Sequence, residues 1–213
     1  MKVKIKKEGK KETYNLIDSW SDVTLEKWIK LININTESKT EEAEEIIAAL
    51  SGIPNELIKK LSLRDVAIIL GKISDLQSQQ DTALKKVIEI GGVEYGMHPN
   101  LDDITLGEYA DIESFIKAGL EKNMPEVMAV LFRPVTERKG EAYTIEAYDG
   151  NITIRAEEMK KMSAEQVENA LRFFFAFATE LFKILPAVLE GMQKEVKTQL
   201  QTETLQNAGA GSE

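Results

Sequence analysis

Two stretches near the start of the chain and two near its middle alternate apolar and polar residues with a period of two, which is typical of β-strands. They are residues 3–7 with 12–16 around Glu8-Gly9-Lys10, and residues 87–90 with 93–97 around Gly91-Gly92. Adjacent glycines adopt the positive φ angles that a tight hairpin turn requires. The pattern therefore predicts one β-hairpin at each place.

Each predicted hairpin is followed by a threonine and then by apolar residues at helical spacing. Thr105 and Glu108 have the spacing of a capping box, in which the hydroxyl accepts from an early amide and the carboxylate accepts from the N–H of the cap. Thr24 has Lys27 in place of that glutamate. We therefore expect a helix after each hairpin, with the full capping box only in the second.

Further helices are expected in both halves. One runs from about Thr40 to Leu50 and is terminated by Gly52, while its counterpart runs from about Pro125 to Phe132, because proline is favoured in a first helical turn. Two more apolar-periodic helices then begin at capping signals, which are Ser62 with Asp65 and Ser163 with Gln166.

The two sets of elements repeat at a constant offset. Tyr14 matches Tyr95, an offset of 95 − 14 = 81 residues, and the same offset relates Trp28 to Tyr109. The segments that match are 14–28 with 95–109 and 45–50 with 126–131. The shared positions are apolar anchors and helix caps, with no nucleophile, base or metal ligand among them. Tandem duplication of one small module is the simplest cause, and the shared pattern serves folding.

The second copy carries additional residues before its last helix. Ser62 and Ser163 lie 163 − 62 = 101 residues apart, which is 101 − 81 = 20 more than the earlier offset. Residues 142–148 and 151–155 alternate in the manner of strands around Asp149-Gly150. This predicts a β-hairpin that is inserted only in the second copy.

A phenylalanine-rich helix is expected from Leu171 to Met192, with Pro186 kinking or dividing it and a polar tail beyond Lys197. Its apolar residues cover more than one face, which is more than a small neighbour would hide. The excess either contacts a partner protein or is clamped by both copies as their common core. The residues expected to contact a partner are Phe174, Phe177, Leu181, Phe182, Leu185 and Leu189.

Composition excludes several classes of protein. The 213 residues are 43% hydrophobic, which suits a globular core, and 27 Lys and Arg against 36 Asp and Glu give a net charge of −9. This charge disfavours general binding to nucleic acid. The lysines of the first hairpin are the exception, and they suit protection of a strand edge better than a nucleic-acid contact. They are Lys2, Lys4, Lys6, Lys7, Lys10 and Lys11.

Cysteine chemistry, a membrane span and a signal peptide are also not expected. Cysteine is absent, which excludes disulfides, thiolate nucleophiles and cysteine-built metal sites. The longest apolar stretch, residues 171–189, contains charged residues and Pro186, so no membrane span is expected. The first residues lack the apolar region of a signal peptide.

The residues that could carry chemistry have structural interpretations. His98 is the only histidine, which excludes His-pair metal sites, and we expect it in a loop without a chemical role. Asp22, Asp102 and Asp103 adjoin helix starts, where exposed amides favour carboxylates. No catalytic residue, metal ligand or cofactor is therefore predicted. The aromatic residues expected in the core rather than in base stacking are Trp20, Trp28, Tyr95 and Tyr109.

Residues 20–28 and 101–111 share the pattern aspartate, aliphatic residue, threonine, leucine, two residues, aromatic residue. In this pattern, and over residues 10–190, the chain resembles small acidic proteins encoded among the structural genes of tailed bacteriophages, notably phages of the Bacteroidetes. Members of this kind are usually virion components or tail-assembly factors. The resemblance implies phage structural proteins as partners, a place in the virion or the host cytoplasm, and no catalytic residues.

The sequence predicts an α+β protein of two hairpin-plus-helices modules, residues 1–82 and 83–192, with a polar tail at 193–213. The predicted function is a non-enzymatic protein-binding component of a tailed bacteriophage, either in the head–tail apparatus or as a tail-assembly chaperone. Two alternatives stay open: a small enzyme with a carboxylate site, and a nucleic-acid adaptor that uses the lysine-rich first strand. Self-association is also open, because a duplicated module can replace a homodimer or seed a ring.

Overall fold

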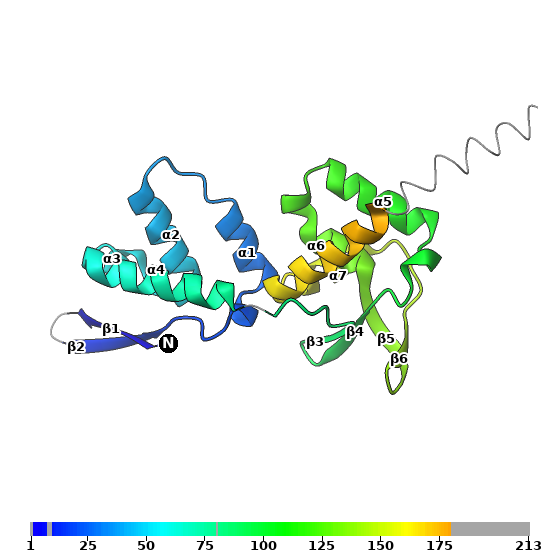
Figure 1. Ribbon diagram of the computed structural model, residues 1–213, viewed down its shortest axis with the longest axis horizontal. Coiled ribbons are helices and arrows are strands. Elements are labelled where there is room, and N and C mark those ends of the chain that lie inside the picture. Colours follow the sequence, from blue (N-terminus) through cyan, green and yellow to red (C-terminus); the bar gives the residue numbers. More distant parts are fainter. Residues whose placement is uncertain (1, 8–9, 80, 180–213) are drawn as a thin grey trace, which may run out of the picture. The chain divides into compact units, whose positions relative to one another are not determined.

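The computed structural model describes the chain except for residues 1, 8–9, 80 and 180–213 (Figure 1). It has the α+β architecture that the sequence predicts. The chain divides into two compact units, Met1–Ala170 and Leu171–Glu213, and the elements named below lie in the first. In the part of the chain that is described, no helix combines the length and the apolar composition needed to cross a bilayer.

The first copy contains a two-stranded antiparallel sheet followed by helices (Figure 1). Its elements are β1 (Lys2–Lys7), β2 (Lys10–Asn15), the 3-10 turn η1 (Trp20–Asp22), α1 (Leu25–Ile32), α2 (Lys39–Ser51), α3 (Asn55–Ile58) and α4 (Leu63–Ser78). Val3 lies opposite Tyr14 in the hairpin. Gly52, with a φ of +63°, ends α2 in the left-handed conformation. The predicted hairpin and helices of this copy are confirmed.

The second copy begins in the same way and then adds strands (Figure 1). Its elements are β3 (Val87–Ile90), β4 (Val93–Met97), the 3-10 turn η2 (Leu101–Asp103), α5 (Leu106–Lys117), α6 (Leu120–Leu131), β5 (Phe132–Lys139), β6 (Ala142–Ile145) and α7 (Ile152–Met159). Its strands form an antiparallel sheet in the order β3-β4-β5-β6. The additional hairpin of β5 and β6 therefore extends the sheet that β3 and β4 begin.

The duplication is visible in the backbone hydrogen bonds. The Ile17 amide donates to the Leu50 carbonyl at 3.2 Å, and 81 residues later the His98 amide donates to the Leu131 carbonyl at 2.7 Å. After the insertion the offset becomes 101 residues, as predicted, since Val66 donates to Ser62 and Val167 donates to Ser163. The same local hydrogen-bonded structure therefore occurs in both copies, at an offset of 81 residues before the insertion and 101 residues after it.

The inserted hairpin differs from its prediction in the position of its turn. The prediction of a turn at Asp149-Gly150 is wrong, because the chain reverses at Gly140, which has a φ of +63°. Asp149 instead stands before α7, where its Oδ1 accepts from the Asn151 amide at 2.9 Å and pairs with Arg155 at 2.7 Å. Residues 151–155 therefore begin a helix and form no strand.

Gly96 in β4 is required by the inserted hairpin. A Cβ at this position would lie 2.5 Å from the ring of Tyr143 and 2.8 Å from the Ile145 side chain, both on β6. Tyr143 is held there because its hydroxyl donates to the Met97 carbonyl at 2.7 Å. Gly96, which lies within the predicted strand 93–97, is thus a point of close approach between two strands.

Helix α6 begins earlier than expected. It starts at Leu120 and not at Pro125, and it is kinked at Asn123, where φ is −110° and ψ is 19°. Proline removes a helical hydrogen bond and crowds the preceding turn, which accounts for a kink just before it. The Asn123 side-chain amide donates to the Gly119 carbonyl at 2.8 Å and supports this irregular turn.

The apolar core of the first copy is formed by η1, α2, α3, α4 and the segments that adjoin them, with one residue from the second copy. Its members are Leu16, Ile17, Trp20, Val23, Ile47, Leu50, Ile53, Leu57, Ile58, Ile69, Ile73 and Ala164. Trp20 and Tyr95 are buried and Trp28 packs against this core, while Tyr109 is half-buried. The expectation that these aromatic residues serve packing is confirmed for Trp20, Trp28 and Tyr95, and for Tyr109 it stays a prediction.

Residues 164–179 are helical and extend into the second unit. Of the residues expected to contact a partner, Phe174 is buried and Phe177 is half-buried. The remaining ones lie outside the described residues, as do Pro186 and the polar tail. They are Leu181, Phe182, Leu185 and Leu189. Their partner role stays a prediction.

Candidate functional site

The second copy contains a buried ion pair that the sequence pattern did not reveal. Glu108 on α5 is 1% exposed and Arg133 on β5 is 4% exposed. Arg133 Nη2 lies 2.7 Å from Glu108 Oε1, and the Nε2 of His98 lies 3.9 Å from the same oxygen. The other oxygen, Oε2, accepts from the amide of Thr105 at 2.8 Å and from its hydroxyl at 2.6 Å. Both carboxylate oxygens are therefore engaged by the chain itself.

The surroundings keep Glu108 ionised and His98 neutral. Burial favours the protonated carboxyl, but the hydrogen bonds from Thr105 and the charge of Arg133 outweigh it, so the pKa of Glu108 lies below its ordinary value. Burial lowers the pKa of His98, against the opposing effect of Glu108. An imidazole with a lowered pKa carries no charge at neutral pH.

The segment after the inserted hairpin covers this ion pair. The guanidinium carbon of Arg133 lies 5.7 Å from the centre of the Tyr148 ring, a cation–π contact. The Tyr148 hydroxyl donates to Asp111 on α5. Burial, followed by this hydrogen bond, raises the pKa of the Tyr148 phenol. Tyr148 thus joins the inserted segment to α5 and shields Arg133 from water.

This buried cluster offers little to a substrate. Its carboxylate is inaccessible, and no group of three or more metal-ligating side chains occurs among the described residues. Sequence reasoning identified Glu108 only as a capping residue. The sequence contained one signal for the buried ion pair, which is Arg133. This charged residue directly follows the apolar run Val127–Phe132 and precedes a proline. A buried charge normally requires a partner of opposite sign, which Glu108 supplies.

The capping carboxylates behave differently in the two copies. Asp22 acts as predicted, since its Oδ2 accepts from the Ser19 amide at 3.0 Å. In the second copy Asn100 is the cap of η2, because its Oδ1 accepts from the Asp102 amide at 3.2 Å. Asp103 accepts from the Asn100 side chain at 2.9 Å. The Asp22 and Asp103 carboxylates therefore support the turns that they adjoin.

An apolar groove lies between α2, α3 and α4 of the first copy, and we call it the α2–α4 groove. Its volume is about 340 Å³. It is lined by Lys39, Thr40, Ala43, Glu44, Ile47, Ile58, Lys59, Leu61, Leu63 and Val66. Leu63 is 84% exposed, and Lys59 pairs with Glu44 at 3.6 Å. An apolar groove with a charged edge suits the apolar side chains of another protein.

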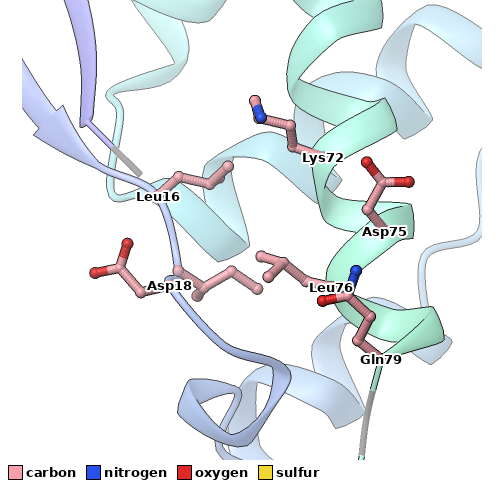
Figure 2. Close-up of a pocket in the computed structure, with 7 residues that line it drawn as sticks. Leu16, Asp18, Lys72, Asp75, Leu76 and Gln79 are labelled. Atoms are coloured by element: carbon pink, nitrogen blue, oxygen red, sulfur yellow. The ribbon is translucent and has the colours of Figure 1, made fainter.

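A second cavity of about 340 Å³ lies between α4 and the segment that follows β2 (Figure 2). Figure 2 shows Leu16 and Leu76 on its two sides, with Lys72 and Asp75 along α4. Both charged side chains are exposed. Asp18, Ile17 and Gln79 complete the lining. This cavity is a gap beside the core and has no buried polar group to select a ligand.

Comparison with known proteins adds no relative to this description. Searches against protein-family models, curated proteins and solved structures found no match.

Proposed function

We propose that the chain is a non-enzymatic, protein-binding component of a larger assembly. The α2–α4 groove is the observation that carries this proposal, because it combines an apolar lining with an exposed leucine at position 63. Exposed apolar surface with a polar edge is characteristic of protein interaction sites. A partner that inserts apolar side chains between α2 and α4 would remove this surface from water.

The buried ion pair supports a binding role over catalysis. Glu108 and Arg133 neutralise each other away from solvent, and Thr105 occupies the remaining carboxylate oxygen. A general base needs to reach the proton that it abstracts, and the Glu108 carboxylate is buried. The contact between Glu108 and Arg133 joins α5 to the inserted hairpin, which is a structural role.

The specific assembly that we propose is a tailed bacteriophage particle or its precursor. The support is the resemblance in residues 20–28 and 101–111 to small acidic phage proteins. The chain would then be either a component of the head–tail apparatus or a chaperone that covers apolar surface on a tail protein. Quantitative mass spectrometry of purified virions and infected-cell lysate separates these roles. A fixed copy number in virions supports the first, and abundance only in lysate supports the second.

The groove itself is tested with two matched substitutions. Ala43 lines the groove, whereas Ala67 on α4 is exposed outside it. Ala43→Glu introduces a charge into the groove and is expected to abolish co-purification of the chain with its particle or tail partner. Ala67→Glu should leave co-purification unchanged. If both variants co-purify at the level of the unmodified chain, the groove is not the binding site.

A further inference from the structure

The two copies contact each other through the starts of two helices. The Leu25 amide donates to the Met162 carbonyl at 2.7 Å, and the Ala164 amide donates to the Val23 carbonyl at 2.8 Å. Thr24 and Ser163 thereby form an antiparallel β-bridge. Leu25 and Ala164 are fully buried in this contact. We call the pairing of residues 23–25 with 162–164 the inner contact.

The inner contact satisfies amides that a helix cannot satisfy internally. The first N–H groups of any helix lack an intrahelical acceptor. Leu25 is the first residue of α1, and Ala164 follows the cap Ser163 at the start of its own helix. Each helix start therefore supplies the acceptor that the other lacks, and the paired side chains become buried.

The duplication places the same two segments elsewhere in the chain, where they do not meet. Residues 104–106 correspond to 23–25 at the offset of 81, and residues 61–63 correspond to 162–164 at the offset of 101. Leu106 and Leu63, the first helical residues of these two segments, are each 84% exposed. We call 104–106 and 61–63 the outer segments. Each begins a helix behind a Thr or Ser cap, as the segments of the inner contact do.

Within one chain, only one of the two equivalent contacts between the copies is therefore formed. A two-fold relation between the copies would form both contacts at once, whereas here one is formed and its equivalent is left exposed. We propose that residues 104–106 of one molecule bind residues 61–63 of a second copy of this chain, in the geometry of the inner contact. Each molecule then offers one outer segment of each kind, so association is head-to-tail and builds a ring or a filament.

Charges beside the outer segments are complementary. Asp102 and Asp103 are exposed next to residues 104–106, while Lys60 and Arg64 are exposed on either side of residues 61–63. Opposite charges across an interface favour the correct pairing and speed its formation. The cap side chains need no rearrangement, because Thr105 already accepts from the Glu108 amide and Ser62 from the Asp65 amide, as Thr24 and Ser163 do in the inner contact.

The test compares three single substitutions at exposed positions. Leu63→Asp and Leu106→Asp each place a charge in one outer segment, and Ile154→Asp is the control, because Ile154 is 71% exposed and lies elsewhere, on α7. Circular dichroism verifies that each variant is folded. Analytical ultracentrifugation over concentrations up to about 1 mM is expected to show association of the unmodified chain and of Ile154→Asp. The apparent association constant of each leucine variant should fall at least about tenfold.

Mixing the two leucine variants tests the head-to-tail geometry. Leu63→Asp keeps an intact segment 104–106, and Leu106→Asp keeps an intact segment 61–63, so the mixture should form a one-to-one dimer and nothing larger. A monomeric unmodified chain, a single variant that associates as the unmodified chain does, or a mixture that stays monomeric would each overturn the proposal. Leu61 and Leu63 also line the α2–α4 groove, whereas Leu106 does not. Leu106→Asp should therefore lose self-association and keep partner binding, which separates this result from any failure of the groove as a partner site.

Discussion

The two copies share a backbone but fill it with different side chains. At one matched position the first copy has Ile17 in an apolar core, and the second has His98 beside a buried ion pair. Gly52 ends α2 in the first copy, and Arg133 takes the matching place at the start of β5. The repeated features are backbone hydrogen bonds and caps. The copies therefore share local backbone structure, while the buried ion pair of Glu108 and Arg133 belongs to the second copy alone among the described residues.

The inserted hairpin explains how the second copy can bury charge. Taking two ions out of water is costly unless they pair well and their remaining polar atoms find partners. Tyr148, which follows the hairpin, lies against Arg133, and Thr105 donates two hydrogen bonds to Glu108 Oε2, while Arg133 Nε has no hydrogen-bond partner among the described residues. The first copy has no insertion, and Lys27 stands in place of Glu108. The residues that differ between the copies at these positions thus contact one another in the second copy.

The largest expected effect comes from breaking the ion pair. Arg133→Ala leaves the Glu108 carboxylate buried without a counter-charge, and the free energy of unfolding should fall by about 3–5 kcal/mol. Urea denaturation measures this. Replacing both charges, as Arg133→Met with Glu108→Gln, should recover most of the loss. Lys27→Ala in the first copy should change stability by less than about 0.5 kcal/mol. Equal losses from Arg133→Ala and Lys27→Ala would contradict the contrast between the copies.

The next effect concerns the strand that carries the insertion. Gly96→Ala would force the Tyr143 ring away from β4 and should cost about 1–3 kcal/mol in unfolding free energy, because well-packed regions tolerate added atoms poorly. Asn15, the matching residue in β2, already carries a side chain, so Asn15→Ala is the control and should be near neutral. A Gly96→Ala variant as stable as the control would show that the hairpin can shift without cost.

Acidic pH should weaken the second copy selectively. The pKa of His98 is lowered from 6.5 in the folded state, so its stabilising contribution is complete above that value and is lost as pH falls. Glu108, whose pKa is lowered from 4.5, adds a second loss at more acidic pH. Between about pH 7.5 and pH 5.5, protonation of His98 can lower the free energy of unfolding by at most about 1.4 kcal/mol per pH unit. His98→Gln should weaken this dependence of the free energy of unfolding on pH. An unchanged pH dependence would exclude His98 as its source.

Local signals made much of the fold predictable. The hairpin at Gly91-Gly92, the caps at Thr24 and Thr105, and both offsets depend on residues that are close in sequence, and the structure confirms them. Asp149-Gly150 was misassigned because aspartate followed by glycine occurs both in hairpin turns and before helices. When the flanking segments are short, the spacing of their apolar residues does not distinguish a hairpin turn from the start of a helix.

The ion pair could not be predicted because its members lie far apart in sequence. Arg133 follows Glu108 only after α5, a turn and α6, and its burial depends on how β5 leaves α6. The exposure of Leu106 has the same origin, since Leu25 has an equivalent sequence context and is fully buried. Which copy of a repeated residue becomes buried is decided by tertiary contacts, which a single-chain pattern does not contain.

The smallest effect compares the two helix caps. Thr24 accepts from the Lys27 amide at 3.4 Å, whereas Thr105 accepts from the Glu108 amide at 3.2 Å and also donates to the Glu108 carboxylate at 2.6 Å. Removing a cap costs about 0.5–2 kcal/mol, so Thr24→Ala should fall near the lower end and Thr105→Ala near the upper end. Glu108→Ala combined with Thr105→Ala should be less than additive, because both substitutions remove the hydrogen bond between the Thr105 hydroxyl and the Glu108 side chain. Equal costs for the two threonines, measured by urea denaturation, would mean that the ion pair does not depend on its cap.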